Sequence, residues 1–254
     1  MDLIFDTHAH YDDKAFDEDR EDVIDMLFKN GVCGVVNQGT DIKTSEFGIN
    51  LAQRYDKFYT AVGLHPECLD ENSINDLDKI KELAKNEKVV AIGEIGLDYY
   101  YDIPKDLQKT IFAKQLELAK ELDMPVNIHD REAHGDTLEM LKQYKPKGIV
   151  HCFSGSVEMA REIIKLGMYI GIGGVVTFKN ARKTVEVIEE IPLERLVLET
   201  DCPYLSPVPF RGKRNDSSMI KYTALRIAEI RNTTAEEILT ITRKNAADVY
   251  GLKL

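Results

Sequence analysis

The sequence predicts a single α/β barrel in which eight short strands alternate with helices. Apolar runs of strand length recur along the chain, and each is followed by a loop and a helix-like segment. Several of these runs are continuously apolar, as expected for parallel strands that are buried on both faces. The length of 254 residues is also typical of one closed barrel. We therefore expect residues 1–254 to form one (β/α)₈ TIM-barrel domain with an extra C-terminal helix.

The strands are predicted from the apolar runs, and the helices from the periodicity of the segments between them. We expect strands at 3–7, 32–38, 58–64, 89–95, 126–129, 149–153, 169–173 and 196–200. The clearest helix spans 107–122, with apolar residues on one side and Lys and Glu on the other. A last amphipathic helix is expected at 235–250. No G-x-G-x-x-G segment follows the first strand, which argues against a dinucleotide-binding sheet.

Composition argues against several classes of protein. The longest apolar candidate, 168–178, is too short to cross a bilayer and is interrupted by three glycines. The chain begins with an early acid and no basic region, so we expect no secretory signal and a cytoplasmic location. The acidic surface and the lack of a long exposed apolar run predict a monomer. The four cysteines have no C-x-x-C spacing, which argues against a disulfide framework. A net charge of −11 argues against passive coating of duplex DNA, but not against an enzyme with local positive charge.

Six side chains of metal-binding type stand at the ends of predicted strands. They are His8, His10, Glu94, His129, His151 and Asp201. Because the C-terminal strand ends of a barrel meet in one area, we expect these residues to converge. An isolated His pair or a lone Glu is often merely hydrogen-bonded, but six such donors in one cavity would be costly without a cation. The set exceeds the needs of one ion and suits two divalent ions, with Glu94 bridging them.

The types of ligand atom restrict which metals could bind but do not select one. Mixed imidazole and carboxylate ligands suit Zn, Mn, Fe, Co or Ni, while Mg prefers more oxygen. We therefore expect two divalent ions, with Mg, Mn or Zn as candidates. Cys152 and Cys202 each follow a predicted ligand, so strand alternation should turn both thiols toward the helix layer.

Seven segments together resemble the TatD family of metal-dependent deoxyribonucleases, within the larger group of amidohydrolase-like barrels. They are IFDTHAHYD (4–12), GLHP (63–66), IGEIGLDYY (92–100), PVNIHDREA (125–133), HCFSG (151–155), LETDCPYL (198–205) and RGKRN (211–215). The resemblance implies a (β/α)₈ barrel, a divalent-metal site formed by the same six residues, and exonuclease (3′→5′) or endonuclease activity on DNA. Members of the family often continue RGKRN with Glu-Pro, whereas this chain has Asp216-Ser217-Ser218.

The expected reaction is hydrolysis of a DNA phosphodiester by metal-bound hydroxide, with single strands or 3′ ends as the substrate. Asp201 is the candidate to orient the water and accept its proton, together with Glu94 as the second catalytic carboxylate. Glu199 should share the inward face and fix a ligand. His65 is expected either to contact a substrate phosphate or to be packed by Pro66, and His134 to lie at the surface or cap a helix.

Basic and aromatic residues on the predicted loops are candidates for substrate contact. Arg131, Arg211, Lys213 and Arg214 could bind phosphate, although Arg131 could instead pair with Asp136. Bases could stack on aromatic side chains, or these could simply pack at the rim; they are Tyr99, Tyr100, Tyr101, Tyr204 and Phe210.

Two other functions remain open from the sequence. The same two-metal chemistry could act on a carbonyl or a small phosphoester, for example an aminoacyl ester. A scaffold or binding protein that has lost catalysis is the other, although every expected ligand is present.

Overall fold

Eight parallel strands are hydrogen-bonded in chain order, which confirms the predicted barrel. The protein is described by a computed structural model that covers residues 3–253. The strands are β1 (Ile4–Ala9), β2 (Val32–Gln38), β3 (Phe58–Val62), β4 (Val89–Asp98), β5 (Val126–Arg131), β6 (Gly148–Val150), β7 (Tyr169–Ile172) and β8 (Leu196–Leu198). A parallel bridge between Ala9 and Cys202 brings the segment after β8 back to β1.

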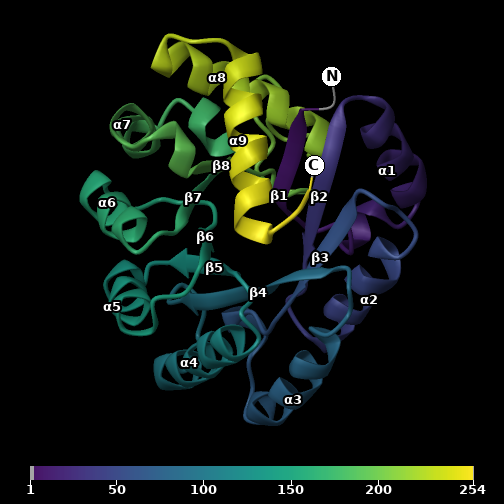
Figure 1. Ribbon diagram of the computed structural model, residues 1–254, viewed down its shortest axis with the longest axis vertical. Helices are drawn as coiled ribbons and strands as arrows, with labels where there is room; N and C mark the ends of the chain where they lie inside the picture. Colours follow the sequence, from purple (N-terminus) through teal and green to yellow (C-terminus); the bar gives the residue numbers. More distant parts are fainter. Residues whose placement is uncertain (1–2, 254) are drawn as a thin grey trace.

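A ring of helices surrounds the strands (Figure 1). The helices are α1 (Arg20–Lys29), α2 (Ile42–Ala52), α3 (Ser73–Leu83), α4 (Lys105–Glu121), α5 (His134–Tyr144), α6 (Val157–Lys165), α7 (Arg182–Glu190), α8 (Ile220–Arg231) and α9 (Ala235–Tyr250). The predicted last helix has the bounds of α9, and α4 corresponds to the predicted 107–122. Within residues 3–253, no helix is both long and apolar enough to span a membrane.

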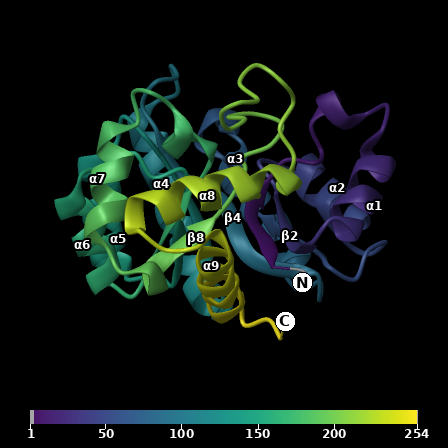
Figure 2. The same cartoon turned by 90° about the horizontal axis from the view of Figure 1, so that it is seen from above.

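The extra helix α9 lies at one end of the barrel, and the long loop after β8 lies at the other (Figures 1 and 2). The hydroxyl of Tyr250 bonds to the Thr7 carbonyl at 3.1 Å and to Asn127 Oδ1 at 3.0 Å, which ties α9 to β1 and β5. The ring of Tyr250 stacks on Phe5. This packing leaves the opposite end, where the strands terminate, for polar side chains.

The strand ends differ from the prediction by up to three residues. Strand β1 continues two residues beyond Thr7, so that His8 belongs to the strand itself. Strand β4 continues to Asp98, whereas β6 ends at Val150 and not at 153. Hydrogen bonding decides these bounds: the register of β4 with β5 extends through Asp98–Arg131, a pairing that apolar patterning alone does not predict.

Candidate metal centre

All six predicted ligands converge at the C-terminal ends of the strands. Glu94 lies at the centre and is 3% exposed. Its Oε2 is 3.2 Å from His8 Nε2 and 3.5 Å from His10 Nε2. The Oδ1 of Asp201 completes this first group, at 3.4 Å from His10 Nε2 and 3.8 Å from His8 Nε2. The first group therefore contains two imidazole nitrogens and two carboxylate oxygens.

The other oxygen of Glu94 faces a second group of donors. Oε1 is 2.9 Å from His151 Nε2 and 3.0 Å from His129 Nδ1. The two imidazole nitrogens are 3.4 Å apart. Each carboxylate oxygen of Glu94 thus belongs to a different set of nitrogen donors, which is the arrangement of a bridging ligand.

The spacing of the donor atoms fits metal ions. Ligand atoms bonded to one ion at about 2.0–2.2 Å lie roughly 3.0–3.5 Å from one another, and most distances within both groups fall in or near that range. In addition, His8 Nε2 and His10 Nε2 point at each other at 3.2 Å. Two lone pairs in this position repel unless a proton or a cation lies between them. The residues present therefore fit divalent metal ions.

The orientation of His129 is fixed by a residue that the sequence analysis missed. The Nε2 of His129 lies 2.9 Å from Oδ2 of Asp98, which is 1% exposed. When Nε2–H donates to this carboxylate, the lone pair of Nδ1 is left to face Glu94 and the second group. Burial opposes the charged imidazole, but hydrogen bonds with Asp98 and Glu94 raise the pKa of His129 to about 9, so an ion that binds Nδ1 has to displace the proton there. Asp98 lies four residues after Glu94 on β4. Strand alternation turns side chains at this spacing to the same face, so the sequence contained a signal for Asp98.

His65 forms a group with Glu94 and His129 that could hold a metal ion, but its hydrogen bonds favour the opposite arrangement of its ring nitrogens. Its Nδ1 accepts the backbone N–H of Glu67 at 3.2 Å. The proton of the neutral ring is therefore on Nε2, which lies 3.5 Å from Glu94 Oε1. A donor in this position suits a substrate oxygen better than a cation.

The carboxylates of the centre are ionised. Burial raises the pKa of Glu94, but the imidazoles of His8, His151 and His65 hold it well below its usual value. Burial likewise raises the pKa of Asp201, but the hydrogen bond with His10 and nearby imidazoles lower it overall. By contrast, burial and the charge of His151 lower the pKa of His8 to about 4, which leaves it neutral as a ligand must be.

Glu199 lies behind the centre, on the inward face as predicted. Its Oε1 accepts the backbone N–H of Cys152 at 2.5 Å and is 3.8 Å from His151 Nδ1. Among the described residues, Oε2 of Glu199 and Nδ1 of His8 and of His151 are buried without a hydrogen-bond partner. A side chain at Gly171 would place its Cβ 2.4 Å from this carboxylate, so the glycine is required by the close approach.

Two polar cavities adjoin the centre and contain most of the predicted substrate residues. One, of about 590 Å³, includes His65, Arg131, Tyr101 and the exposed side of the metal ligands. The other, of about 510 Å³, includes Arg211, Lys213, Arg214 and Lys14. Asp13 and Tyr204 line both cavities, so the basic one continues from the metal centre.

The basic and aromatic candidates have partners of their own within the protein. Arg214 makes two hydrogen bonds to the Asp19 carboxylate at 2.7–2.8 Å, and the guanidinium of Arg211 lies 3.7 Å from the centre of the Phe178 ring. Arg131 stacks 3.8 Å over Tyr100. It does not pair with Asp136, which instead binds Tyr99 and Lys109.

The remaining candidates differ in availability. Tyr100 and Tyr204 are more than half exposed, although Arg131 already stacks on the ring of Tyr100. The Tyr204 hydroxyl donates to Asp13 at 2.7 Å, and the Tyr99 hydroxyl donates to Asp136. Phe210 packs against Tyr222. His134 begins α5 and pairs with Asp130 at 2.8 Å, in keeping with its predicted surface position.

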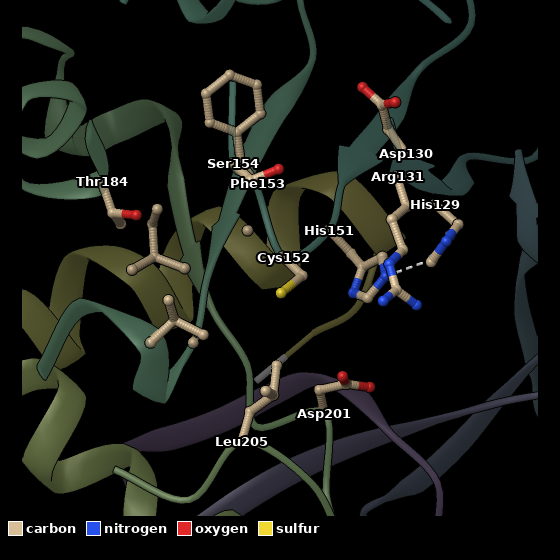
Figure 3. A pocket seen from close by; sticks show the side chains of 14 residues that line it. His129, Asp130, Arg131, His151, Cys152, Phe153, Ser154, Thr184, Asp201 and Leu205 are labelled. Carbon is tan, nitrogen blue, oxygen red and sulfur yellow. Dashed lines mark hydrogen bonds between the residues drawn. The ribbon is translucent and has the colours of Figure 1, made fainter. Parts of the chain in front are cut away.

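The prediction for Cys152 was wrong, whereas Cys202 is fully buried as expected. Strand β6 ends at Val150, and Cys152 has a φ of +43°, so strand alternation no longer sets its direction. Figure 3 shows its sulfur directed into a third cavity, with Asp201 and His151 on one side and Thr184 on the other. This apolar cavity has a volume of about 450 Å³.

Most of the chain matches a protein family. A profile described as TatD related DNase aligns with residues 5–251. The chain belongs to the TatD family.

Individual relatives agree with this assignment. The chain is 47% identical to the uncharacterized metal-dependent hydrolase YabD of Bacillus subtilis, over 98% of this chain and 100% of that protein. It is 35% identical to YcfH of Escherichia coli, another uncharacterized metal-dependent hydrolase, over 98% and 96%. The crystal structure of YJJV, a TatD homolog from E. coli, superposes with a TM-score of 0.91 at 33% identity and 99% coverage of both chains. This TatD-family protein is therefore a metal-dependent hydrolase.

Proposed function

We propose that this protein is a deoxyribonuclease that cleaves DNA phosphodiester bonds with two divalent metal ions, acting as a 3′→5′ exonuclease. The observation that carries the proposal is the position of Glu94, whose two oxygens face separate groups of donors. His8, His10 and Asp201 would hold one ion, His129 and His151 the other, and Glu94 both. When bound, such a pair lowers the pKa of a water molecule and offsets charge that develops on phosphorus. Mn, Zn and Mg are the candidate metals.

Residues of the chain provide the proton transfers and the orientation. The water oxygen forms a bond to phosphorus, the bond from phosphorus to one sugar oxygen breaks, and a proton moves to that leaving oxygen. Asp201 is ionised and open to the cavity, so it can orient the water and take its proton. His65 carries its proton on the nitrogen that faces the same cavity, which suits a phosphate oxygen or the leaving oxygen.

The continuation of the site toward Arg211, Lys213 and Arg214 supports an extended anionic substrate. Arg214 is ordered by Asp19 and contributes a fixed charge. Because the net charge is −11, the few cations that line the basic cavity would decide where the strand binds.

A cleavage assay with end-labelled DNA tests the proposal. Chelator-treated protein would be incubated with single-stranded and duplex DNA, with Mg, Mn or Zn added back, beside Glu94→Ala. We expect metal-restored shortening from the 3′ end, absent in the variant. Intact DNA with every metal, while the protein still binds two ions, would exclude the phosphodiester substrate.

A second candidate is hydrolysis of an aminoacyl ester or a related carbonyl substrate. The observation that favours it is the acidic side of the polar cavity, which is lined by Asp12, Asp13, Glu67 and Asp98. Carboxylates beside the metal centre suit an ammonium group next to the ester carbonyl. Turnover of aminoacyl esters by a protein that leaves methyl phosphodiesters intact would select this function.

A further inference from the structure

We propose that the apolar cavity beside the metal centre is the subsite for the terminal nucleoside of a DNA strand, and that Val175 and Leu205 determine what fits there. This inference rests on the deoxyribonuclease function proposed above. It places the terminal nucleoside in the apolar cavity and the rest of the DNA strand outside that cavity.

The position of the cavity places its occupant next to the reacting bond. His129, His151 and Asp201 line this cavity and also line the polar cavity. Arg131 borders both as well. A phosphate held at the metal centre therefore has one side toward each cavity, and a group in the apolar one is within a few bonds of phosphorus.

The lining of the cavity suits an uncharged planar group. Its walls are formed by Phe153, Ile172, Val175 and Leu205, and Gly171 and Gly173 contribute backbone without side chains. Figure 3 shows Thr184 at the far side from Asp201. Among the described residues, the Ser154 and Thr184 side chains that line it make no hydrogen bond within the protein, so both hydroxyls are available to the edge of a base.

Size and charge exclude a continuous strand from this cavity. At about 450 Å³ it lies toward the small end of ligand pockets, which range over roughly 300–1,000 Å³. Apart from the histidines, Arg131 at the metal side is its only cationic lining residue. Further phosphates would lose their counterions there without compensation. The basic cavity with Lys14, Arg211 and Lys213 shares Leu205 with the apolar cavity, and it shares Asp13 and Tyr204 with the polar cavity. The cations that suit the rest of the strand therefore lie outside the apolar cavity.

The decisive experiment pairs a filled cavity with a substrate that lacks the base. Val175→Trp would be compared with the natural protein on two single-stranded oligonucleotides, one ending in a normal 3′ nucleotide and one in an abasic residue. Leu225→Trp is the matched control, because Leu225 is half exposed on α8 and does not line the cavity. Hydrolysis of dimethyl phosphate, which has neither a base nor another planar group, reports on the metal centre itself.

Stacking of one base contributes a factor of roughly 10 to 100, so Val175→Trp should lower kcat/KM on the normal end by that factor. The abasic end should be cut more slowly by the natural protein to a similar extent, with no additional loss in the variant. Both variants should hydrolyse the small diester at rates within about threefold of the natural protein.

Two results would overturn the inference in distinguishable ways. In the first, the natural protein cleaves DNA, but Val175→Trp lowers kcat/KM on the abasic end by the same factor as on the normal end. The base then does not occupy this cavity. If the natural protein hydrolyses the small diester and leaves DNA intact with every metal, the deoxyribonuclease function fails together with the subsite.

Discussion

Two buried carboxylates near the same end of the barrel have very different surroundings. Asp6 is fully buried and accepts hydrogen bonds from the hydroxyls of Thr200 and Ser217 and from the backbone N–H groups of Thr200 and His8. Glu94 is nearly as buried but is surrounded by imidazole nitrogens. Every donor around Asp6 is an ordinary hydrogen-bond donor, so its network is complete without a cation. The imidazole nitrogens around Glu94 contact its oxygens favourably only when they carry protons or bind metal ions.

The comparison shows that burial of an acid does not by itself indicate a functional site. Burial raises the pKa of Asp6 to about 6 against the hydrogen bonds that it accepts, whereas the pKa of Glu94 is held well below its usual value. We therefore expect substitutions at Glu94 to affect metal binding and catalysis, and substitutions at Asp6 to affect the free energy of unfolding.

The largest effect should come from Glu94→Gln. The amide retains the shape but cannot bridge two cations, so we expect kcat/KM to fall about 1,000-fold or more, the equivalent of about 4 kcal/mol. Steady-state kinetics with saturating Mn would measure this loss. Thermal unfolding of the metal-free protein should be almost unchanged, and a variant that unfolds instead would show that Glu94 is structural.

Asp6→Ala should give the converse result. It leaves two hydroxyls and two backbone N–H groups without their acceptor, which costs about 3 kcal/mol of unfolding free energy. Urea unfolding of chelator-treated protein measures this change. Metal affinity of the folded variant should remain within a few-fold of the natural protein, and a loss as large as that of Glu94→Gln would remove the distinction between the two acids.

The pH dependence of stability offers a second test of Asp6. Its pKa is 3.8 when unperturbed and about 6 in the folded state, so between these values the folded state binds more protons than the unfolded one. The natural protein should therefore lose stability relative to Asp6→Asn as pH rises from about 4 to 6. Urea titrations at both ends of this window, with metal removed, would reveal it. A constant difference would contradict the raised pKa.

Asp98→Asn should have an intermediate effect on the metal centre. The amide oxygen is a weaker hydrogen-bond acceptor than the carboxylate for the Nε2–H of His129, so the ring is oriented less firmly. We therefore expect metal affinity to fall about 10- to 100-fold. Calorimetric titration with Mn would measure it. Asp136→Asn is a matched control, since that acid binds Tyr99 and Lys109 away from the ligands, and an equal loss there would contradict the role of Asp98.

The smallest effect should come from Ser217→Ala. The hydroxyl of Ser217 donates to Asp6 at 2.7 Å. Loss of one of the four hydrogen bonds to Asp6 should cost about 1 kcal/mol of unfolding free energy, again measured with urea. No change would mean that this serine has no part in the Asp6 network.

The sequence predicted the barrel and the six converging ligands because apolar strand runs and the residues that follow them are local patterns. Asp98 and Asp6 were missed, since their roles depend on contacts with His129 on another strand and with residues nearly 200 positions away. Cys152 was misplaced because its positive φ follows from where β6 ends. The bond from Arg214 to Asp19 also joins distant segments, which no spacing rule predicts.

The bridging position of Glu94 is tested most directly by metal stoichiometry and magnetic coupling. Electron paramagnetic resonance of the protein titrated with Mn would report both at once. We predict two Mn ions per chain with a spin-coupled spectrum, and loss of the coupling in Glu94→Gln. One ion per chain, or two ions with an uncoupled spectrum in the natural protein, would contradict the two-metal centre.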